Sequence, residues 1–75
     1  MGILPSLKAK DIIRALKKIG FIEDRQKGSH LTLIHPETKT RAVVPMHSGR
    51  DIKKPLVRAI INDARLTVED FIKLL

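Results

Sequence analysis

Apolar residues recur at helical spacing over the first third of the chain. They are Ala9, Ile12, Ile13, Leu16 and Ile19. Apolar residues three and four apart lie on one face of a helix, so the pattern predicts a helix between Ser6 and Ile19, with Ser6 as its N-cap. Gly20 is expected to end the helix in a left-handed conformation, and Phe21 to close the hydrophobic contact of that stop.

Two segments typical of β-strands follow the helix. Residues 21–27 are only weakly apolar, which favours an edge strand. Residues 30–35 are rich in Leu, Ile and Thr, which favours a second strand. The dipeptide Gly28-Ser29 between them is a two-residue hairpin signal, so the two strands are predicted to be antiparallel neighbours.

A loop and a third strand come next. Residues 36–40 read Pro-Glu-Thr-Lys-Thr and form the loop, and residues 41–46 form the strand, which has two valines at its centre. Pro45 lacks a backbone N–H, so strand pairing is expected to stop there. Residues 47–54 then form a basic loop.

Helical spacing returns in the last part of the chain. A helix is predicted from Pro55 to Ala64, with a buried stripe made of Leu56, Val57, Ile60, Ile61 and Ala64. The segment Thr67-Val68-Glu69-Asp70 resembles a capped helix start, with Asp70 in place of the usual Glu. A short last helix is expected to reach Leu75, with three side chains turned inward: Phe71, Ile72 and Leu75.

The predicted order is α-β-β-β-α-α, which makes the fold α+β. Successive hairpins imply a three-stranded antiparallel sheet with the helices on one face and the other face open. Without its final helix, this is also the order of double-stranded-RNA-binding domains. Seventy-five residues suffice for one small core, so residues 1–75 are expected to form a single domain.

Charge is concentrated in the body of the chain. The net charge is +7; residues 1–58 hold 13 Lys/Arg against 5 Asp/Glu, and residues 59–75 hold 2 against 3. A basic body favours a polyanionic partner such as nucleic acid, or an acidic protein. Two Phe without Trp or Tyr argue against a protein that binds single strands by stacking bases.

Composition also restricts the kinds of bond and metal site that are possible and the expected location of the protein. The chain has no cysteine, which excludes disulfides and thiolate metal sites. No apolar run approaches about 18 residues and no signal peptide is visible, so we expect a cytoplasmic protein without a membrane span.

His30 is the main candidate for chemistry. It opens the second strand beside the Gly28-Ser29 turn, with the cation Lys27 three residues before it. Such a residue among cations could be enough for RNA cleavage, because the nucleophile, the 2′-hydroxyl, belongs to the substrate. An imidazole can move the proton of this hydroxyl, and cations can stabilise the charge on the phosphorane. The alternative is that His30 is an ordinary strand residue hydrogen-bonded to its own hairpin.

Two other kinds of site find less support. His30 and His35 are five apart on one strand, so their side chains should point to opposite faces and not share a metal ion. Ser29 and His30 are neighbours and should also point apart, which argues against a Ser-His-Asp triad. No metal and no cofactor are expected.

Several short motifs resemble one family. These are Gly20-Phe21, then Arg25-Gln26-Lys27-Gly28-Ser29-His30, then Val44-Pro45-Met46-His47 with the basic loop after it. Over nearly its whole length the chain resembles HicA toxins, small mRNA interferases of prokaryotic toxin–antitoxin modules. The resemblance implies a double-stranded-RNA-binding-like fold, a metal-independent ribonuclease whose catalytic residue is His30, and a HicB antitoxin that covers the active surface.

The chain departs from the family pattern at two places. Lys54-Pro55-Leu56 stands where members have Gly-Thr-Leu, so the threonine cap is lost and Pro55 is expected at the first helical position. Arg65 stands where members often have glycine, so it must adopt a left-handed conformation or change the turn.

Three functions are therefore considered. The first is a toxin-type endoribonuclease using His30, the second is a non-catalytic RNA-binding module, and the third is a protein-interaction domain with a basic face. RNA contacts are expected from the hairpin turn and the basic loop, namely Lys27, Gly28, Ser29, His47, Arg50, Lys53 and Lys54.

Overall fold

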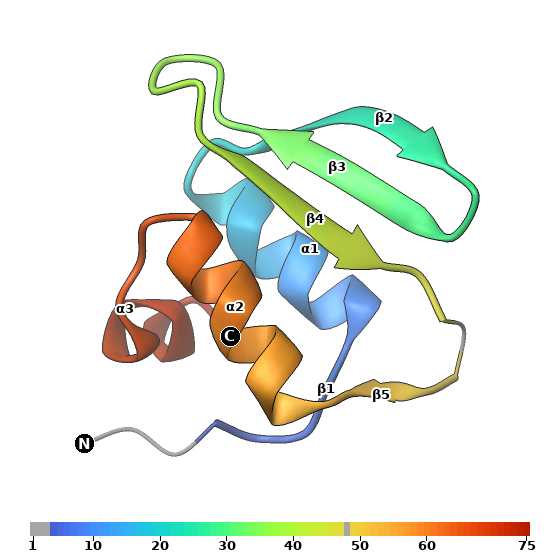
Figure 1. Ribbon diagram of the computed structural model, residues 1–75. Helices are drawn as coiled ribbons and strands as arrows, with labels where there is room; N and C mark the ends of the chain where they lie inside the picture. Colours follow the sequence, from blue (N-terminus) through green and yellow to red (C-terminus); the bar gives the residue numbers. More distant parts are fainter. Residues whose placement is uncertain (1–3, 48) are drawn as a thin grey trace.

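The computed structural model describes residues 4–47 and 49–75 (Figure 1). Its fold is α+β and contains the predicted α-β-β-β-α-α order. Two further short strands, β1 and β5, were not predicted. The elements are β1 Leu7–Lys8, α1 Ala9–Lys18, β2 Ile22–Lys27, β3 His30–Ile34, β4 Arg41–Pro45, β5 Asp51–Ile52, α2 Lys54–Asp63 and α3 Val68–Lys73.

The main sheet has the order β2-β3-β4, and both pairings are antiparallel. The helices lie on one face of this sheet, and the other face is open (Figure 1). β2 is an edge strand, as predicted, and its register shifts between Glu23 and Arg25. Strand pairing ends at Pro45, which lies opposite His30.

The core lies between the sheet and the helices. On β3 and β4 every second side chain is buried against it, because successive residues of a strand point to opposite faces. The predicted stripes of α1 and α2 supply the other side, and Phe71 of α3 is fully buried. The central members are Ile12, Leu16, Leu33, Val44, Val57, Ile60, Ile61 and Phe71.

The first helix is shorter than predicted. It begins at Ala9 because Leu7 and Lys8 pair with Ile52 and Asp51 in the β1–β5 ribbon, so Ser6 is not the N-cap. The carboxylate of Asp11 instead accepts a hydrogen bond from the N–H of Lys8 at 3.0 Å. A backbone held in an extended pair cannot also be the first turn of a helix, and the tertiary pairing overrides the local cap.

The end of α1 is as predicted. Gly20 has a φ of +103°. Its N–H donates to the carbonyl of Lys17, and the N–H of Phe21 donates to the carbonyl of Leu16. These two bonds are the Schellman pattern, and Phe21 is buried beside them.

The ends of the strands differ slightly from prediction. β3 ends at Ile34 and β4 ends at Pro45, one residue earlier than expected in each case. The backbone of His35 closes the loop after β3, since its N–H donates to the carbonyl of Thr40 and its carbonyl accepts from the N–H of Lys39. Nε2 of its ring lies 3.0 Å from the carbonyl oxygen of Ile19, and Nδ1 accepts from the N–H of Glu37. The His35 ring packs edge-on against Phe21, with centroids 5.4 Å apart.

The helix α2 differs at both ends from the predicted range of 55–64. It begins at Lys54, so Pro55 occupies its second position, and Lys53 is an N-cap without a side-chain hydrogen bond. Leu56 was predicted to be buried but is 43% exposed. Its side chain instead lines a surface hollow, together with Ile52 and Pro55.

The last two elements are joined by a turn in which Arg65 has a φ of +62°, so the arginine adopts the left-handed conformation. The side chain of Thr67 accepts from the N–H of Asp70 at 3.0 Å, and the predicted cap of α3 is confirmed. Leu75 was predicted to turn inward but is 46% exposed, because α3 ends at Lys73 and Leu74 packs against the core instead. Within the described residues no helix is long and apolar enough to cross a membrane.

Candidate nucleic-acid interface

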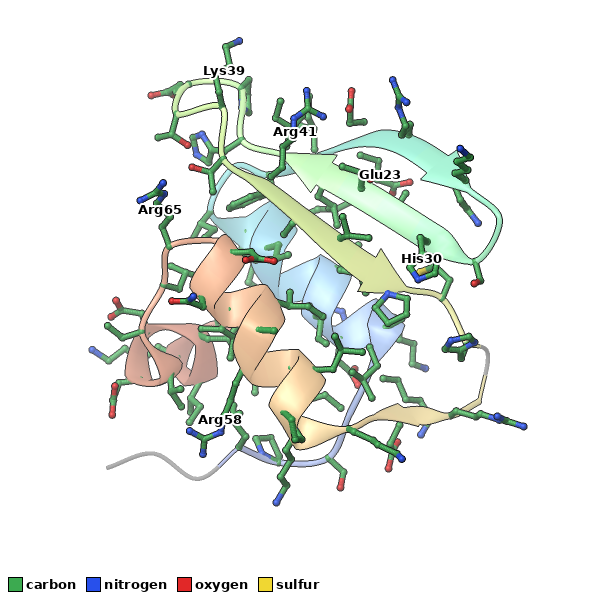
Figure 2. The ribbon with its side chains drawn as sticks, in the orientation of Figure 1. Glu23, His30, Lys39, Arg41, Arg58 and Arg65 are labelled. Carbon is green, nitrogen blue, oxygen red and sulfur yellow. The ribbon has the colours of Figure 1, made fainter. Side chains whose placement is uncertain are left out.

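His30 stands on the open face of the sheet, at the end of β3 next to the β2–β3 turn (Figure 2). Its backbone lies opposite Lys27 on β2 and Pro45 on β4. Residues directly opposite each other in an antiparallel sheet share a face, so Lys27 and His30 project to the same side. Both are exposed.

The turn before His30 has a defined geometry. Gly28 has a φ of +59°, which the primed hairpin turns require and which other residues adopt at a cost. A side chain at Gly28 would meet no atom within 4 Å, so the backbone conformation alone calls for glycine. The turn therefore sets the position of His30 through its backbone.

The hydrogen bonds of this turn leave the His30 ring unused. The Gln26 amide donates to the carbonyl of Gly28, and the N–H of Met46 donates to the carbonyl of Ser29. Neither bond involves the imidazole. The hydrogen bonds of the turn therefore give no support to the alternative in which the His30 ring is hydrogen-bonded to its own hairpin. His35 contrasts with it, because both nitrogens of that ring contact backbone groups.

A hollow of about 410 Å³ opens beside the end of β4. We call it the β5–α2 hollow, because β5 and the first turn of α2 supply half of the residues that line it. Its lining brings three of the predicted RNA contacts together, His47, Arg50 and Lys53. Pro45 also lines it. Because Pro45 lies directly opposite His30 on the neighbouring strand, the hollow begins next to the candidate catalytic residue.

The other predicted contacts do not line this hollow. Lys27 lies opposite His30, and the carbonyl of Ser29 accepts a hydrogen bond from the N–H of Met46, the residue after Pro45. Lys54 is exposed at the first position of α2 and is not among the lining residues, although it follows Lys53 directly.

A second hollow, of about 350 Å³, lies on the other side of His47. We call it the β4–α1 hollow. It is lined by Lys8, Ala9, Lys10, Met46, His47 and Gly49. The two lysines were not predicted as site residues, because the only sequence signal was their charge. The Nζ of Lys8 lies 3.3 Å from Oδ1 of Asp51, a side chain that lines the first hollow.

His30 and His35 lie on opposite sides of the sheet, as predicted. The ring of His35 packs against the buried Phe21 on the helix side, whereas His30 faces the open side. Over residues 4–47 and 49–75, no three His, Cys, Asp or Glu side chains gather in a geometry that could hold a metal ion.

A comparison with protein families identifies one match. The family described as "HicA toxin of bacterial toxin-antitoxin" matches residues 9–66 of the 75-residue chain. The match begins at the first residue of α1 and ends just after Arg65, so it includes the whole sheet, His30 and the β5–α2 hollow. No curated protein matches the chain.

Proposed function

The chain belongs to the HicA toxin family and is therefore a toxin of a toxin–antitoxin module, and on this premise we propose that it is a metal-independent endoribonuclease that cleaves mRNA. The observation that carries the proposal is the exposed ring of His30, which has no hydrogen bond to any other described residue; its strand partner Pro45 lines the hollow that also holds His47, Arg50 and Lys53.

The reaction requires few groups. The 2′-oxygen of one nucleotide attacks the adjacent phosphorus, and the bond from that phosphorus to the 5′-oxygen of the next nucleotide breaks. The products are a 2′,3′-cyclic phosphate and a 5′-hydroxyl. His30 takes the proton of the 2′-hydroxyl as a general base or donates one to the leaving 5′-oxygen as a general acid.

The other residues bind and stabilise the substrate. Lys27 shares the face of His30 and is a candidate to stabilise the phosphorane charge, together with backbone N–H groups of the turn. His47, Arg50 and Lys53 would bind neighbouring phosphates, and Lys54, which is exposed and follows Lys53 directly, is a further candidate for a phosphate contact. A turn that positions His30 through the backbone reduces the entropy lost when the ring is aligned with its substrate.

The test uses purified protein, a single-stranded RNA and matched substrates. We expect cleavage to leave a 2′,3′-cyclic phosphate, to stop when the scissile nucleotide carries a 2′-deoxyribose, and to continue in the presence of chelators. Normal cleavage of the 2′-deoxy substrate would rule out the internal nucleophile, and loss of cleavage on chelation would rule out metal independence.

RNA binding without cleavage is the second candidate function. Arg50 and Lys53, the two cations that line the β5–α2 hollow, favour it independently, because they would hold phosphates whether or not His30 acts on them. A wild-type protein that binds RNA and leaves it intact would select this function.

Membership of the family implies an antitoxin partner. We propose that the partner is HicB-like and covers His30 from the open face of the sheet. That face exposes Ile22 by 51% and Val43 by 44%, and it carries Arg25 and Lys27, which lie opposite Thr32 and His30. An acidic protein with apolar contact residues matches this combination of charge and exposed surface.

A further inference from the structure

Apart from His47, the residues that line the β4–α1 hollow have no part in the proposed site. His47 lines both this hollow and the β5–α2 hollow, so the two hollows are neighbours. Resting on the proposed function, we infer that bound RNA continues past His47 into the β4–α1 hollow, where Lys8 and Lys10 contact its phosphates. The ligand there is the sugar–phosphate backbone, and the contact lengthens the RNA footprint without reading bases.

The position of Lys10 is not explained by the electrostatics of its helix. Lys10 lies in the first turn of α1, where the helix dipole favours acids and disfavours cations. The first turn of α3, on the far side of the molecule, holds Glu69 and Asp70 as this rule predicts. Lys10 also takes no part in the three ion pairs found among the described residues. A cation that lacks a local benefit and lines a hollow suits an anionic ligand.

Lys8 is available to the same ligand at little cost. Its ion pair with Asp51 joins two half-exposed side chains, and such pairs contribute little to stability. A phosphate can therefore replace the carboxylate as the partner of Lys8. Asp51 is the only carboxylate that lines either hollow among the described residues, and its charge opposes RNA there.

The test measures the affinity of the full-length protein for a fluorescent single-stranded RNA with 2′-O-methyl groups, which cannot be cleaved, over a range of salt concentrations. One phosphate contact contributes a log–log salt slope of about −0.7 for a single strand. Lys10→Ala should therefore reduce the magnitude of the slope by about 0.7 and weaken binding about fivefold at 0.1 M salt, the factor that this slope implies.

Two further variants serve as controls for Lys10→Ala. Lys73→Ala removes the same charge from α3, away from both hollows, and should leave the slope unchanged. Asp51→Asn keeps the shape of the side chain, removes the opposing charge and should tighten binding. Since Lys10→Ala replaces an exposed lysine in a helix by a strong helix former, the variant should fold.

Lys53→Ala separates the inference from the proposed function. If Lys53→Ala weakens binding while Lys10→Ala behaves like Lys73→Ala, RNA does not enter the β4–α1 hollow and the inference is wrong, although the proposed function stands. If the wild-type protein neither binds nor cleaves RNA, the proposed function itself is wrong, and the inference falls with it.

Discussion

Two histidines, His30 at the start of β3 and His35 just after its end, have opposite environments. The ring of His35 bonds the carbonyl of Ile19 and the N–H of Glu37, so Nε2 carries the proton and Nδ1 accepts. It ties the end of α1 to the β3–β4 loop. His30 projects from the other face, at a turn whose hydrogen bonds do not use its ring. The ring of His35 is hydrogen-bonded and that of His30 is exposed, so substitutions of these two residues should have different effects.

His30→Ala should abolish cleavage while leaving the fold and RNA affinity nearly intact. Loss of one acid–base group typically lowers a rate by about 10²–10⁴. An exposed side chain away from the core should change the free energy of unfolding by no more than about 0.5 kcal/mol. Cleavage assays and urea unfolding measure the two effects.

Thr32→Ala, two residues along the same face of β3, is the control and should retain activity. An active His30→Ala variant would show that another residue moves the proton.

Gly20→Ala should destabilise the protein more than Gly28→Ala does. Both glycines have positive φ, so each substitution carries a backbone cost of about 1 kcal/mol or more. At Gly20 the new Cβ would also lie 2.9 Å from Nε2 of His35, a ring that cannot move without losing its bond to Ile19. Urea unfolding of both variants measures the difference.

The contact with His35 can be isolated by a double-mutant cycle. In a His35→Ala background the close contact disappears, so the cost of Gly20→Ala should fall. Equal costs in both backgrounds would mean that the backbone conformation alone determines the effect.

At the scale of the elements, α2 lacks the side-chain hydrogen bond that caps the start of α3. Thr67 caps α3 through its side chain, whereas Lys53 at the start of α2 accepts no such bond. Lys53 has the extended backbone of an N-cap, so a residue with a short oxygen-bearing side chain would fit there. The chain has a lysine in place of a stabilising cap, which is consistent with selection of this position for phosphate binding.

Lys53→Ser should therefore increase stability and decrease RNA affinity. A new cap contributes about 1 kcal/mol to the free energy of unfolding, and loss of one phosphate contact weakens RNA binding about fivefold at 0.1 M salt. Urea unfolding and salt-dependent RNA binding measure the two effects on the same sample.

Thr67→Ala is the complementary variant. It should lose about 1 kcal/mol of stability and bind RNA normally, because α3 does not border either hollow. A Lys53→Ser variant with wild-type RNA affinity would remove Lys53 from the interface.

At the scale of the whole molecule, the open face of the sheet determines how the antitoxin is expected to bind. Ile22→Lys and Val43→Lys should weaken the complex with the antitoxin, since covering apolar surface contributes about 25 cal/mol per Å². Both side chains are exposed and neither is assigned to catalysis or to RNA contacts, so cleavage by the free toxin should persist. Titration calorimetry with the purified antitoxin measures the loss.

Leu75→Lys is the matched control, because Leu75 is similarly exposed but follows α3 at the end of the chain. It should leave the complex intact. If it weakens the complex while Ile22→Lys and Val43→Lys do not, the antitoxin binds the helical side and does not cover His30 from the open face.

Short-range signals predicted much of the fold and part of the site. The glycine stop after α1, the hairpin at Gly28, the cap of α3 and the stripes of α1 and α2 each depend on residues within one or two turns of each other. The alternation of β3 and β4 placed His30 and His35 on opposite sides of the sheet. The order of elements followed, and with it the placement of His30 at an exposed turn.

Only the tertiary structure decided which distant residues meet. The β1–β5 ribbon joins Lys8 to Asp51 across 43 positions, and a strand of two residues is too short to have a periodic pattern. The same pairing moves the start of α1 to Ala9 and brings Lys10 to the hollow that His47 lines. Local sequence determines the conformation of each element, but the sides of a hollow come from segments that meet only when those elements pack.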